Sequence, residues 1–262
     1  MDLKMHPNIK LKSKTSFVTN DAMIEPSRYT LSDLHPITRL SQKMSQALSF
    51  SGTIIIEPIA EADSQEVLTF LKANFFKDEP LNTFLNLGEC KELEEFSLKC
   101  IPEHCSFKAV NSQNKIVGVL LNSLIKKSQC DEEPEKLAEK CEHPKFKKIL
   151  TLMDYIDSNF NIFDVFPEED VVLDAKIISV SPECRGQGVA GRLTERTIEY
   201  MRLNKISVML MMCSSHYSAR VVEKMDFKEV YRLNYADYKV DDEVVFKPEK
   251  PHVATRILVK KY

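Results

Sequence analysis

Three glycines close together mark the stretch of the sequence best suited to binding a charged ligand. Gly186, Gly188 and Gly191 fall within six residues, where an apolar run rich in β-branched residues gives way to a helical pattern. A glycine removes the Cβ atom where a backbone must approach a ligand closely. The free N–H groups at a helix start also point outward with the positive end of the helix dipole. With Arg185 and Arg192 beside them, these residues predict a turn that binds phosphate.

The same glycines allow other interpretations. A Walker A loop requires Gly-Lys-Ser/Thr, which this stretch does not contain. The string Gly186-x-Gly188-x-x-Gly191 fits the bare dinucleotide-binding pattern, but it lies in the second half of the chain. In addition, no acidic residue ends a following strand to bind the ribose. A tight strand-to-helix turn without a ligand is the simplest alternative.

A carboxylate and two hydroxyl groups form a second set of candidates. Glu79 precedes Pro80, which favours a break between two helices, because the residue before a proline is pushed out of the helical region. Ser214 and Ser218 lie four residues apart at a predicted helix start, so both can face one side of that helix. On local pattern alone, a helix cap explains Glu79 as well as a catalytic role does, and N-capping is the default explanation for Ser214 or Ser215.

The elements that must position these residues alternate between strands and helices. Runs of β-branched and apolar residues predict strands, and apolar residues at helical spacing predict helices between them. This alternation indicates one α/β domain over residues 51–262. The strands are expected at 53–59, 106–110, 115–124, 171–180, 206–212, 227–235 and 252–259. The helices are expected from a capping box at Asp63 and Glu66 to before Pro80, onward from Pro80, through 150–156, and at 188–203 and 215–225.

Two segments stand outside this alternation. Residues 1–50 are polar and lack sustained periodicity, and we expect them to form a partly disordered N-terminal arm. Within the arm, Leu40, Met44 and Leu48 recur every four residues and predict one short helix. Residues 126–148 are dense in charge and predict a solvated insertion.

Composition argues against several classes of protein. A net charge of −3 over 262 residues is untypical of a protein that follows nucleic-acid phosphates. No apolar run approaches the ~18 residues of a membrane span, and the first residues lack the apolar core of a secretory signal. Seven scattered cysteines without a Cys-x-x-Cys pair favour reduced thiols over disulfides or a zinc site. We therefore expect a cytoplasmic monomer with no metal, no membrane and no nucleic-acid partner.

Read as Arg185-x-x-Gly188-x-Ala190, the glycine turn resembles the Arg/Gln-x-x-Gly-x-Gly/Ala signature of the GNAT acyl-CoA N-acetyltransferases. The resemblance implies that backbone amides here hold the pyrophosphate of acetyl-CoA, while the preceding strand pairs with its pantetheine arm. It also implies a mixed, twisted central sheet of about seven strands, flanked by helices and splayed at the strand before the turn. The residues implied to bind acetyl-CoA are Ile178, Ser179, Val180, Arg185, Gly186, Gln187, Gly188, Val189, Ala190 and Gly191.

Three further segments narrow the resemblance to one group of acetyltransferases. The insect arylalkylamine (dopamine) N-acetyltransferases are similar at residues 75–82 (FFKDEPLN), 141–148 (CEHPKFKK) and 213–220 (CSSHYSAR). The similarity runs from about Ile54 to the C-terminus and includes parts of residues 31–51. It implies acetyl-CoA as co-substrate and a small arylalkylamine as substrate, of the dopamine, serotonin, tryptamine, tyramine or octopamine type.

Acetyl transfer to an amine has three chemical requirements. An ammonium with a pKa of about 10 must lose a proton, the thioester oxygen must be stabilised as it becomes negative, and the departing thiolate should gain a proton. The resemblance implies that Glu79, Ser214 and Ser218 act together, with Glu79 as general base and Ser218 as general acid. Val222 stands where the broader superfamily often has a tyrosine acid, which favours Ser218 in that role.

The amine itself needs an apolar slot with a polar or acidic wall. The residues that match amine-enclosing positions of the family are Phe75, Phe96, Met153 and Tyr217, and Asp174 adds negative charge nearby. The alternative for each of them singly is a place in the hydrophobic core, where aromatic residues and methionine are common.

Two other functions stay open. The chain could be a GNAT enzyme for a polyamine or a protein N-terminus, although a phenylalanine-rich entrance and the lack of an acidic groove argue against a polyamine. It could also bind CoA without catalysis, although the intact set of Glu79, Ser214 and Ser218 argues against this. For an enzyme we expect direct transfer in a ternary complex, because neither serine has a histidine–carboxylate pair placed by the sequence to make it a nucleophile.

Overall fold

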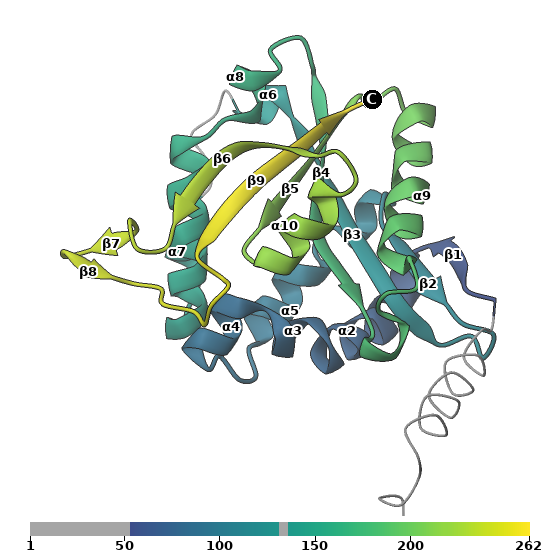
Figure 1. Ribbon diagram of the computed structural model, residues 1–262, viewed down its shortest axis with the longest axis horizontal. Helices are drawn as coiled ribbons and strands as arrows, with labels where there is room; N and C mark the ends of the chain where they lie inside the picture. Colours follow the sequence, from purple (N-terminus) through teal and green to yellow (C-terminus); the bar gives the residue numbers. More distant parts are fainter. Residues whose placement is uncertain (1–52, 131–135) are drawn as a thin grey trace, which may run out of the picture. The chain divides into compact units, whose positions relative to one another are not determined.

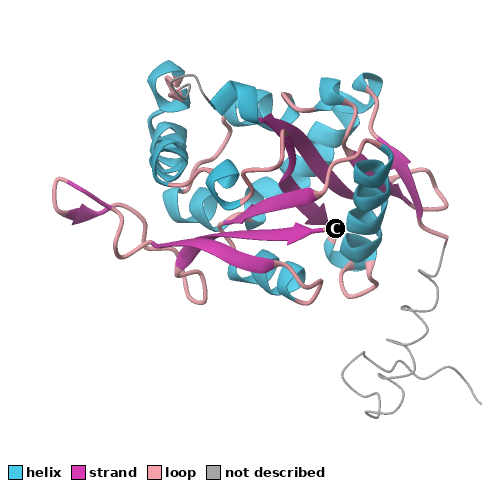
Figure 2. Ribbon diagram, turned by 90° about the horizontal axis from the view of Figure 1, so that it is seen from above, coloured by secondary structure: helices cyan, strands magenta, loops and turns pink. Residues whose placement is uncertain are grey.

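The structure, a computed structural model, describes residues 53–130 and 136–262. A seven-stranded sheet forms the centre of this part of the chain, and helices cover both of its faces (Figures 1 and 2). The predicted arm of residues 1–50, with its helix through Leu40, Met44 and Leu48, lies outside the described residues.

The central sheet is mixed, as the GNAT resemblance implies. Its strand order is β1-β2-β3-β4-β5-β9-β6; β4 and β5 run parallel, and the other neighbours run antiparallel. Each of the seven predicted strands overlaps one of these. Their bounds are β1 Ile55–Pro58, β2 Phe107–Val110, β3 Ile116–Lys126, β4 Val171–Val180, β5 Val208–Cys213, β6 Lys228–Asn234 and β9 Ala254–Lys261.

The sheet opens between its two central strands. β4 pairs with β3 along its whole length, as far as Val180 opposite Gly118. With β5, in contrast, it pairs only around Asp174, which lies opposite Leu210. The last six residues of β4 therefore keep an edge that β5 does not cover. This is the splay that we expected at the strand before the glycine turn.

Alternation of side chains along β5 assigns the large helices to opposite faces of the sheet. Met209 packs into a cluster that includes residues of α9 (Val189–Leu203) and α10 (His216–Glu223). Leu210 points the other way, into a cluster that includes residues of α7 (Pro144–Asn159). Successive residues of a strand point to opposite faces, so α9 and α10 cover one face and α7 covers the other.

Shorter segments complete the described part of the fold. β7 (Lys239–Val240) and β8 (Glu243–Val244) form a small hairpin that projects from the body (Figures 1 and 2). The other helices are α2 Ser64–Ala73, α3 Phe75–Asp78, α4 Pro80–Leu85, α5 Lys91–Leu98, α6 Lys127–Cys130 and α8 Ile162–Val165. Single 3-10 turns lie at Glu61–Asp63, Ile101–Glu103, Leu137–Lys140 and Pro182–Cys184.

Two local predictions were wrong. Asp63 does not start a capping box with Glu66; its carboxylate accepts hydrogen bonds from the Ala60 amide and the Lys108 ammonium, both at 2.8 Å. The end of the supposed insertion at 126–148 is the first turn of α7, where Phe146 is buried. The many charged residues around Phe146 led to the prediction of a solvated segment. A single buried aromatic ring is nevertheless enough to hold the first helical turn against the core.

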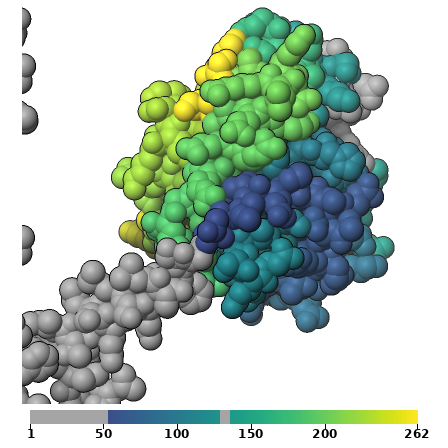
Figure 3. All heavy atoms as spheres, turned by 90° about the vertical axis from the view of Figure 1, so that its right-hand side faces the viewer, coloured from purple at the N-terminus to yellow at the C-terminus, as the bar shows by residue number. Residues whose placement is uncertain are grey.

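The glycine turn is held in place by a close contact between α9 and the sheet. A Cβ atom on Gly118 of β3 would lie 3.1 Å from Val189 Cγ1 and 3.3 Å from the Ser179 carbonyl oxygen. Arg192 of α9 also donates a hydrogen bond to the Ile54 carbonyl at 2.6 Å. Figure 3 shows the resulting surface, with the green residues of α9 directly beside the purple first strand. The start of α9 is therefore fixed against β1 and β3.

A valine at position 118 should disturb this contact. Gly118→Val adds three carbon atoms where even one is too close, and overpacking of this kind typically costs about 1–3 kcal/mol of unfolding free energy. Gly191→Ala is the matched control, because a Cβ atom there meets nothing within 4 Å. Chemical denaturation should show a clear loss for Gly118→Val and no loss, or a gain of up to about 1 kcal/mol, for Gly191→Ala, because alanine is the better helix former. Equal stabilities would show that α9 is free to shift.

Candidate active site

Glu79 lies in the break between α3 and α4, as the proline predicts. Its backbone is extended, with φ −70° and ψ 124°, and Pro80 is the first residue of α4. One carboxylate oxygen accepts a hydrogen bond from the Asn82 amide at 2.6 Å and so caps α4. The other accepts a hydrogen bond from the Ser214 hydroxyl at 2.7 Å. The helix cap and the contact with Ser214 are therefore made by the same side chain.

Ser214 is anchored from the far side by residues that the sequence analysis did not select. Its carbonyl oxygen accepts a hydrogen bond of 2.8 Å from the Tyr235 hydroxyl, which in turn accepts one of 3.1 Å from Thr255. Burial raises the pKa of Tyr235 far above its ordinary value, so the phenol stays protonated and remains a donor. These two hydrogen bonds fix Ser214, which in turn holds Glu79.

Ser218 lies apart from this pair. Its hydroxyl donates a 2.9 Å hydrogen bond to the Ser215 carbonyl within the first turn of α10. The Ser215 hydroxyl accepts a 3.2 Å hydrogen bond from the Tyr217 amide and is the N-cap of that helix. The structure therefore brings Glu79 and Ser214 into contact, while Ser218 stands one helical turn beyond them.

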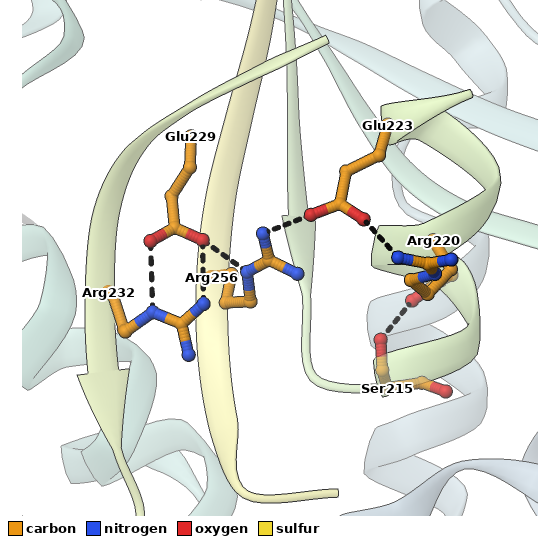
Figure 4. Close-up of polar contacts among 7 residues, drawn as sticks. Ser215, Arg220, Glu223, Glu229, Arg232 and Arg256 are labelled. Carbon is orange, nitrogen blue, oxygen red and sulfur yellow. Dashed lines mark hydrogen bonds and ion pairs between the residues drawn. The ribbon is translucent and has the colours of Figure 1, made fainter. Parts of the chain in front are cut away.

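Ion pairs tie α10 to the neighbouring strands (Figure 4). Arg256 of β9 lies between Glu223 of α10 and Glu229 of β6 and forms an ion pair with each. Glu229 also accepts two hydrogen bonds from Arg232, at 2.9 and 3.0 Å. Bonding to Arg256 lowers the pKa of Glu223 below its ordinary value. The network fixes the helix that follows Ser214.

Glu79 and Ser214 both face a cavity of about 600 Å³. Four of the five residues expected to enclose the amine line this cavity, namely Phe75, Phe96, Met153 and Asp174. Tyr217 does not; it is 63% exposed, and its ring lies edge-on to those of His216 and His252. The other lining residues are mostly apolar side chains of α5, α7 and the sheet.

The cavity also contains charged groups that the sequence analysis missed. Lys176 lies in a bulge of β4 and forms an ion pair of 3.0 Å with Asp174. Its ammonium lies 6.0 Å from the centre of the Phe96 ring. Asp157 of α7 faces the same cavity, and burial, followed by repulsion from Asp174, raises its pKa to about 6. Asp174 was expected in this wall; Asp157 and Lys176 were not, and Asp157 adds a second carboxylate to the cavity beside Asp174.

The glycine turn has the geometry of an anion site. Gly186 and Gly188 have φ values of +78° and +75°, a conformation that favours glycine. In the first intrahelical hydrogen bond of α9, the Arg192 N–H donates to the Gly188 carbonyl at 3.1 Å. The backbone N–H groups of residues 188–191 therefore have no partner within the helix. A Cβ atom on Gly186, Gly188 or Gly191 would meet nothing within 4 Å. The space in front of these amides is open, as a bound pyrophosphate requires.

The Arg185 side chain, which was expected to bind acetyl-CoA, contacts other parts of the protein. Its guanidinium forms an ion pair with Asp78, the residue before Glu79, and its Nε donates to the Val180 carbonyl at 3.1 Å. The Gln187 side chain donates to the Glu183 carbonyl at 2.9 Å. The end of β4 at Ile178–Val180, which β5 does not pair with, leads through the 3-10 turn at Pro182–Cys184 into the glycine turn. Arg185 thus links the turn to the segment that carries Glu79.

The same fold occurs in known N-acetyltransferases, although no protein-family model matches the sequence. Arylalkylamine N-acetyltransferase 2 from Aedes aegypti superposes with a TM-score of 0.73 at 28% identity, covering 80% of this chain and 99% of that chain. The Drosophila melanogaster polyamine N-acetyltransferase, which forms N-acetylagmatine, has a TM-score of 0.71 at 23% identity, covering 80% and 100%. A mosquito arylalkylamine N-acetyltransferase like 5b has a TM-score of 0.71 at 19% identity, with the same coverage.

These likenesses show that the chain has the GNAT fold, and the Aedes aegypti enzyme also supports N-acetyltransferase activity. Within the described residues, no three or more His, Cys, Asp or Glu side chains gather as the ligands of a metal would. No described helix combines the length and the apolar character that crossing a bilayer requires.

The environment of Glu79 leads to a prediction about pH. Burial raises its pKa above the ordinary value, while the bonds from Asn82 and Ser214 act in the opposite direction. Only an ionised carboxylate can accept a proton, so kcat/KM should fall with decreasing pH at a point above the ~4.3 of an ordinary glutamate. Ser214→Ala removes a bond that favours the ionised form, so this acid limb should move to higher pH. A pH profile of kcat/KM measures both effects.

Glu79→Gln provides the control for this profile. The amide oxygen can still accept the Asn82 hydrogen bond, but it cannot act as a base, so kcat/KM should fall by about 10²- to 10⁴-fold. The acid limb should disappear with it, and CoA affinity should change little. Wild-type turnover by Glu79→Gln would show that Glu79 is only a helix cap. An unmoved acid limb in Ser214→Ala would show that the hydroxyl does not influence the base.

Proposed function

We propose that the protein is an acetyl-CoA-dependent N-acetyltransferase for arylalkylamines that transfers the acetyl group directly in a ternary complex. The observation that carries this proposal is the Glu79–Ser214 pair, which faces a largely apolar cavity in a GNAT fold. The similarity to the Aedes aegypti arylalkylamine N-acetyltransferase, at 28% identity over 80% of this chain, supports the activity and the substrate class.

The open end of the sheet supplies the binding site proposed for acetyl-CoA. The amides of residues 188–191 fit the pyrophosphate, because they precede the hydrogen bonds of α9 and because the glycines at 186, 188 and 191 leave the space in front of them open. The edge of β4 at Ile178–Val180 fits the pantetheine arm, because β5 does not pair with it there. When bound, acetyl-CoA supplies the activated acetyl group, and this arrangement directs the thioester toward the splay.

Glu79 is the proposed base. The reacting amine arrives as an ammonium with a pKa of about 10, and it must lose a proton before its lone pair can attack. A carboxylate with a raised pKa accepts that proton more readily than an ordinary glutamate. Both of its oxygens are already held by hydrogen bonds, so the group is oriented before the amine arrives and can act directly or through one water.

Ser218 is the proposed acid toward the departing thiolate, on the strength of the family resemblance. Its hydroxyl donates to the Ser215 carbonyl, and a rotation about one bond would redirect that proton. The Ser214 hydroxyl donates to Glu79. In the described residues neither serine hydroxyl bonds to an imidazole, which favours direct attack by the amine over an acyl-enzyme.

A second candidate is an enzyme for a diamine or agmatine. The Asp157 and Asp174 carboxylates favour it, because they add negative charge to the cavity beyond that of Glu79. Lys176 opposes it, since its ammonium neutralises Asp174 and repels a second cation. The aromatic walls favour an aryl group, and several ammonium groups could not all be solvated among them. We therefore keep arylalkylamines as the proposed substrates.

Steady-state kinetics with both substrates varied tests the proposal. Dopamine, tyramine or tryptamine should give higher kcat/KM than agmatine or spermidine, and double-reciprocal lines should intersect. Parallel lines, or an acetylated serine on the protein, would contradict direct transfer. A kcat/KM for agmatine or spermidine equal to that for dopamine would contradict the substrate class, and no turnover with any amine would leave a CoA-binding module.

Calorimetry with CoA tests the proposed phosphate-binding turn. Gly188→Ala forces a Cβ atom into the left-handed region, at about 1–2 kcal/mol, and places a methyl group at the open amides, so CoA affinity should fall. Gly88→Ala is the matched control, with a φ of +74° and nothing within 4 Å of its Cβ position, but in the loop between α4 and α5. Both variants should lose similar stability. Equal CoA affinities would contradict the assignment of the turn.

A further inference from the structure

Three charged side chains lie together in one part of the wall of the largely apolar cavity. Asp174 and Lys176 of β4 form an ion pair of 3.0 Å, and Asp157 faces them from α7. The structure gives the Asp157 carboxylate no hydrogen bond and no ion pair within the described residues. The side chain is exposed and lines the cavity, so a ligand that fills the cavity displaces the water around it, and an anion left there without a partner is costly. Its place in the cavity wall suggests that the partner is the ligand.

The register of the sheet places this group at a distance from Glu79 and Ser214. Asp174 lies opposite Leu210 in the parallel pair of β4 and β5. Ser214 follows four residues later, and a strand rises about 3.3 Å per residue, so the two levels are about 13 Å apart. Side chains reach into this interval from both ends. A substrate whose amine meets Glu79 can therefore present its far end to Asp157.

The chemistry of the group selects among possible far ends. Asp157 offers carboxylate oxygens as acceptors, and the Lys176 ammonium has three N–H donors, of which Asp174 uses one. A ring hydroxyl both donates and accepts, so it can bond to Asp157 and to Lys176 together. A second cation would bond to Asp157 but would be repelled by Lys176. An unsubstituted ring would leave Asp157 without a partner.

We propose that Asp157, together with Lys176, makes the enzyme selective for arylalkylamines that carry a ring hydroxyl. The hydroxyl donates a hydrogen bond to the Asp157 carboxylate while the ring lies among Phe96, Met153 and their neighbours. This inference rests on the proposed function, and it assigns a specificity-determining role to a residue outside the Glu79–Ser214 pair.

The test compares tyramine with 2-phenylethylamine, which differ by one hydroxyl group. In wild type, kcat/KM should be higher for tyramine. Asp157→Ala should lower the value for tyramine by roughly 10- to 100-fold, as expected for a hydrogen bond to a charged group, and should leave that for 2-phenylethylamine within a few-fold. Asp157→Asn, which keeps the size of the side chain, should give a smaller loss in the same direction. Asp164→Ala, an exposed carboxylate on the adjacent α8, should change neither value.

Two results would overturn the inference. An equal loss for both amines would show that Asp157 only supports the fold, and a loss confined to agmatine would show that it binds a cation. If wild type acetylates no arylalkylamine, the proposed function fails. Calorimetry of tyramine and 2-phenylethylamine with the CoA-loaded protein then still tests the contact. Equal affinities, or a preference for tyramine that survives in Asp157→Ala, would refute it.

Discussion

The separation of β4 from β5 beyond Asp174 is the constraint on which the rest of the site depends. A continuous parallel pair would use the backbone groups on the facing edges of both strands for bonds to each other, and those edges could not meet a ligand. Because pairing stops at Asp174 and Leu210, β4 keeps a free edge that leads to the glycine turn. The end of β5 is likewise free to direct Ser214 toward Glu79. Helices on both faces seat the diverging strands, so the opening persists without a ligand.

The cavity places its charges at separate positions and keeps apolar walls between them. Glu79 lies at the helix break, where Asn82 and Ser214 hold it. In the second set of charges, formed by Asp157, Asp174 and Lys176, Lys176 neutralises Asp174. Glu79 and Asp174 thus have partners from the protein itself, whereas the exposed Asp157 has none within the described residues. A site organised in this way holds the reacting centre rigid and leaves one group free to respond to the substrate.

Local patterns predicted the parts of this site that depend on local physics. The strands, the glycine turn and the break before Pro80 follow from side-chain periodicity and from backbone restrictions on glycine and proline. Lys176 could not be found in this way, because its orientation follows from a bulge opposite β3. Tyr235 depends on β6 and β9 meeting in one register. Asp157 reaches the cavity through the packing of α7, which a charge-dense sequence does not reveal.

The double duty of Glu79 has an evolutionary consequence. Because the side chain caps α4 as well as facing the cavity, losing it costs helix stability, typically about 1 kcal/mol for an N-cap. Selection for folding alone would therefore retain this glutamate in a descendant that no longer acetylates anything. The Ser214 hydroxyl caps no helix, and its hydrogen bond to Glu79 is its contribution. In a lineage that drifts toward inactivity, the serine would be free to change first, and its identity would be the more informative marker of a working enzyme.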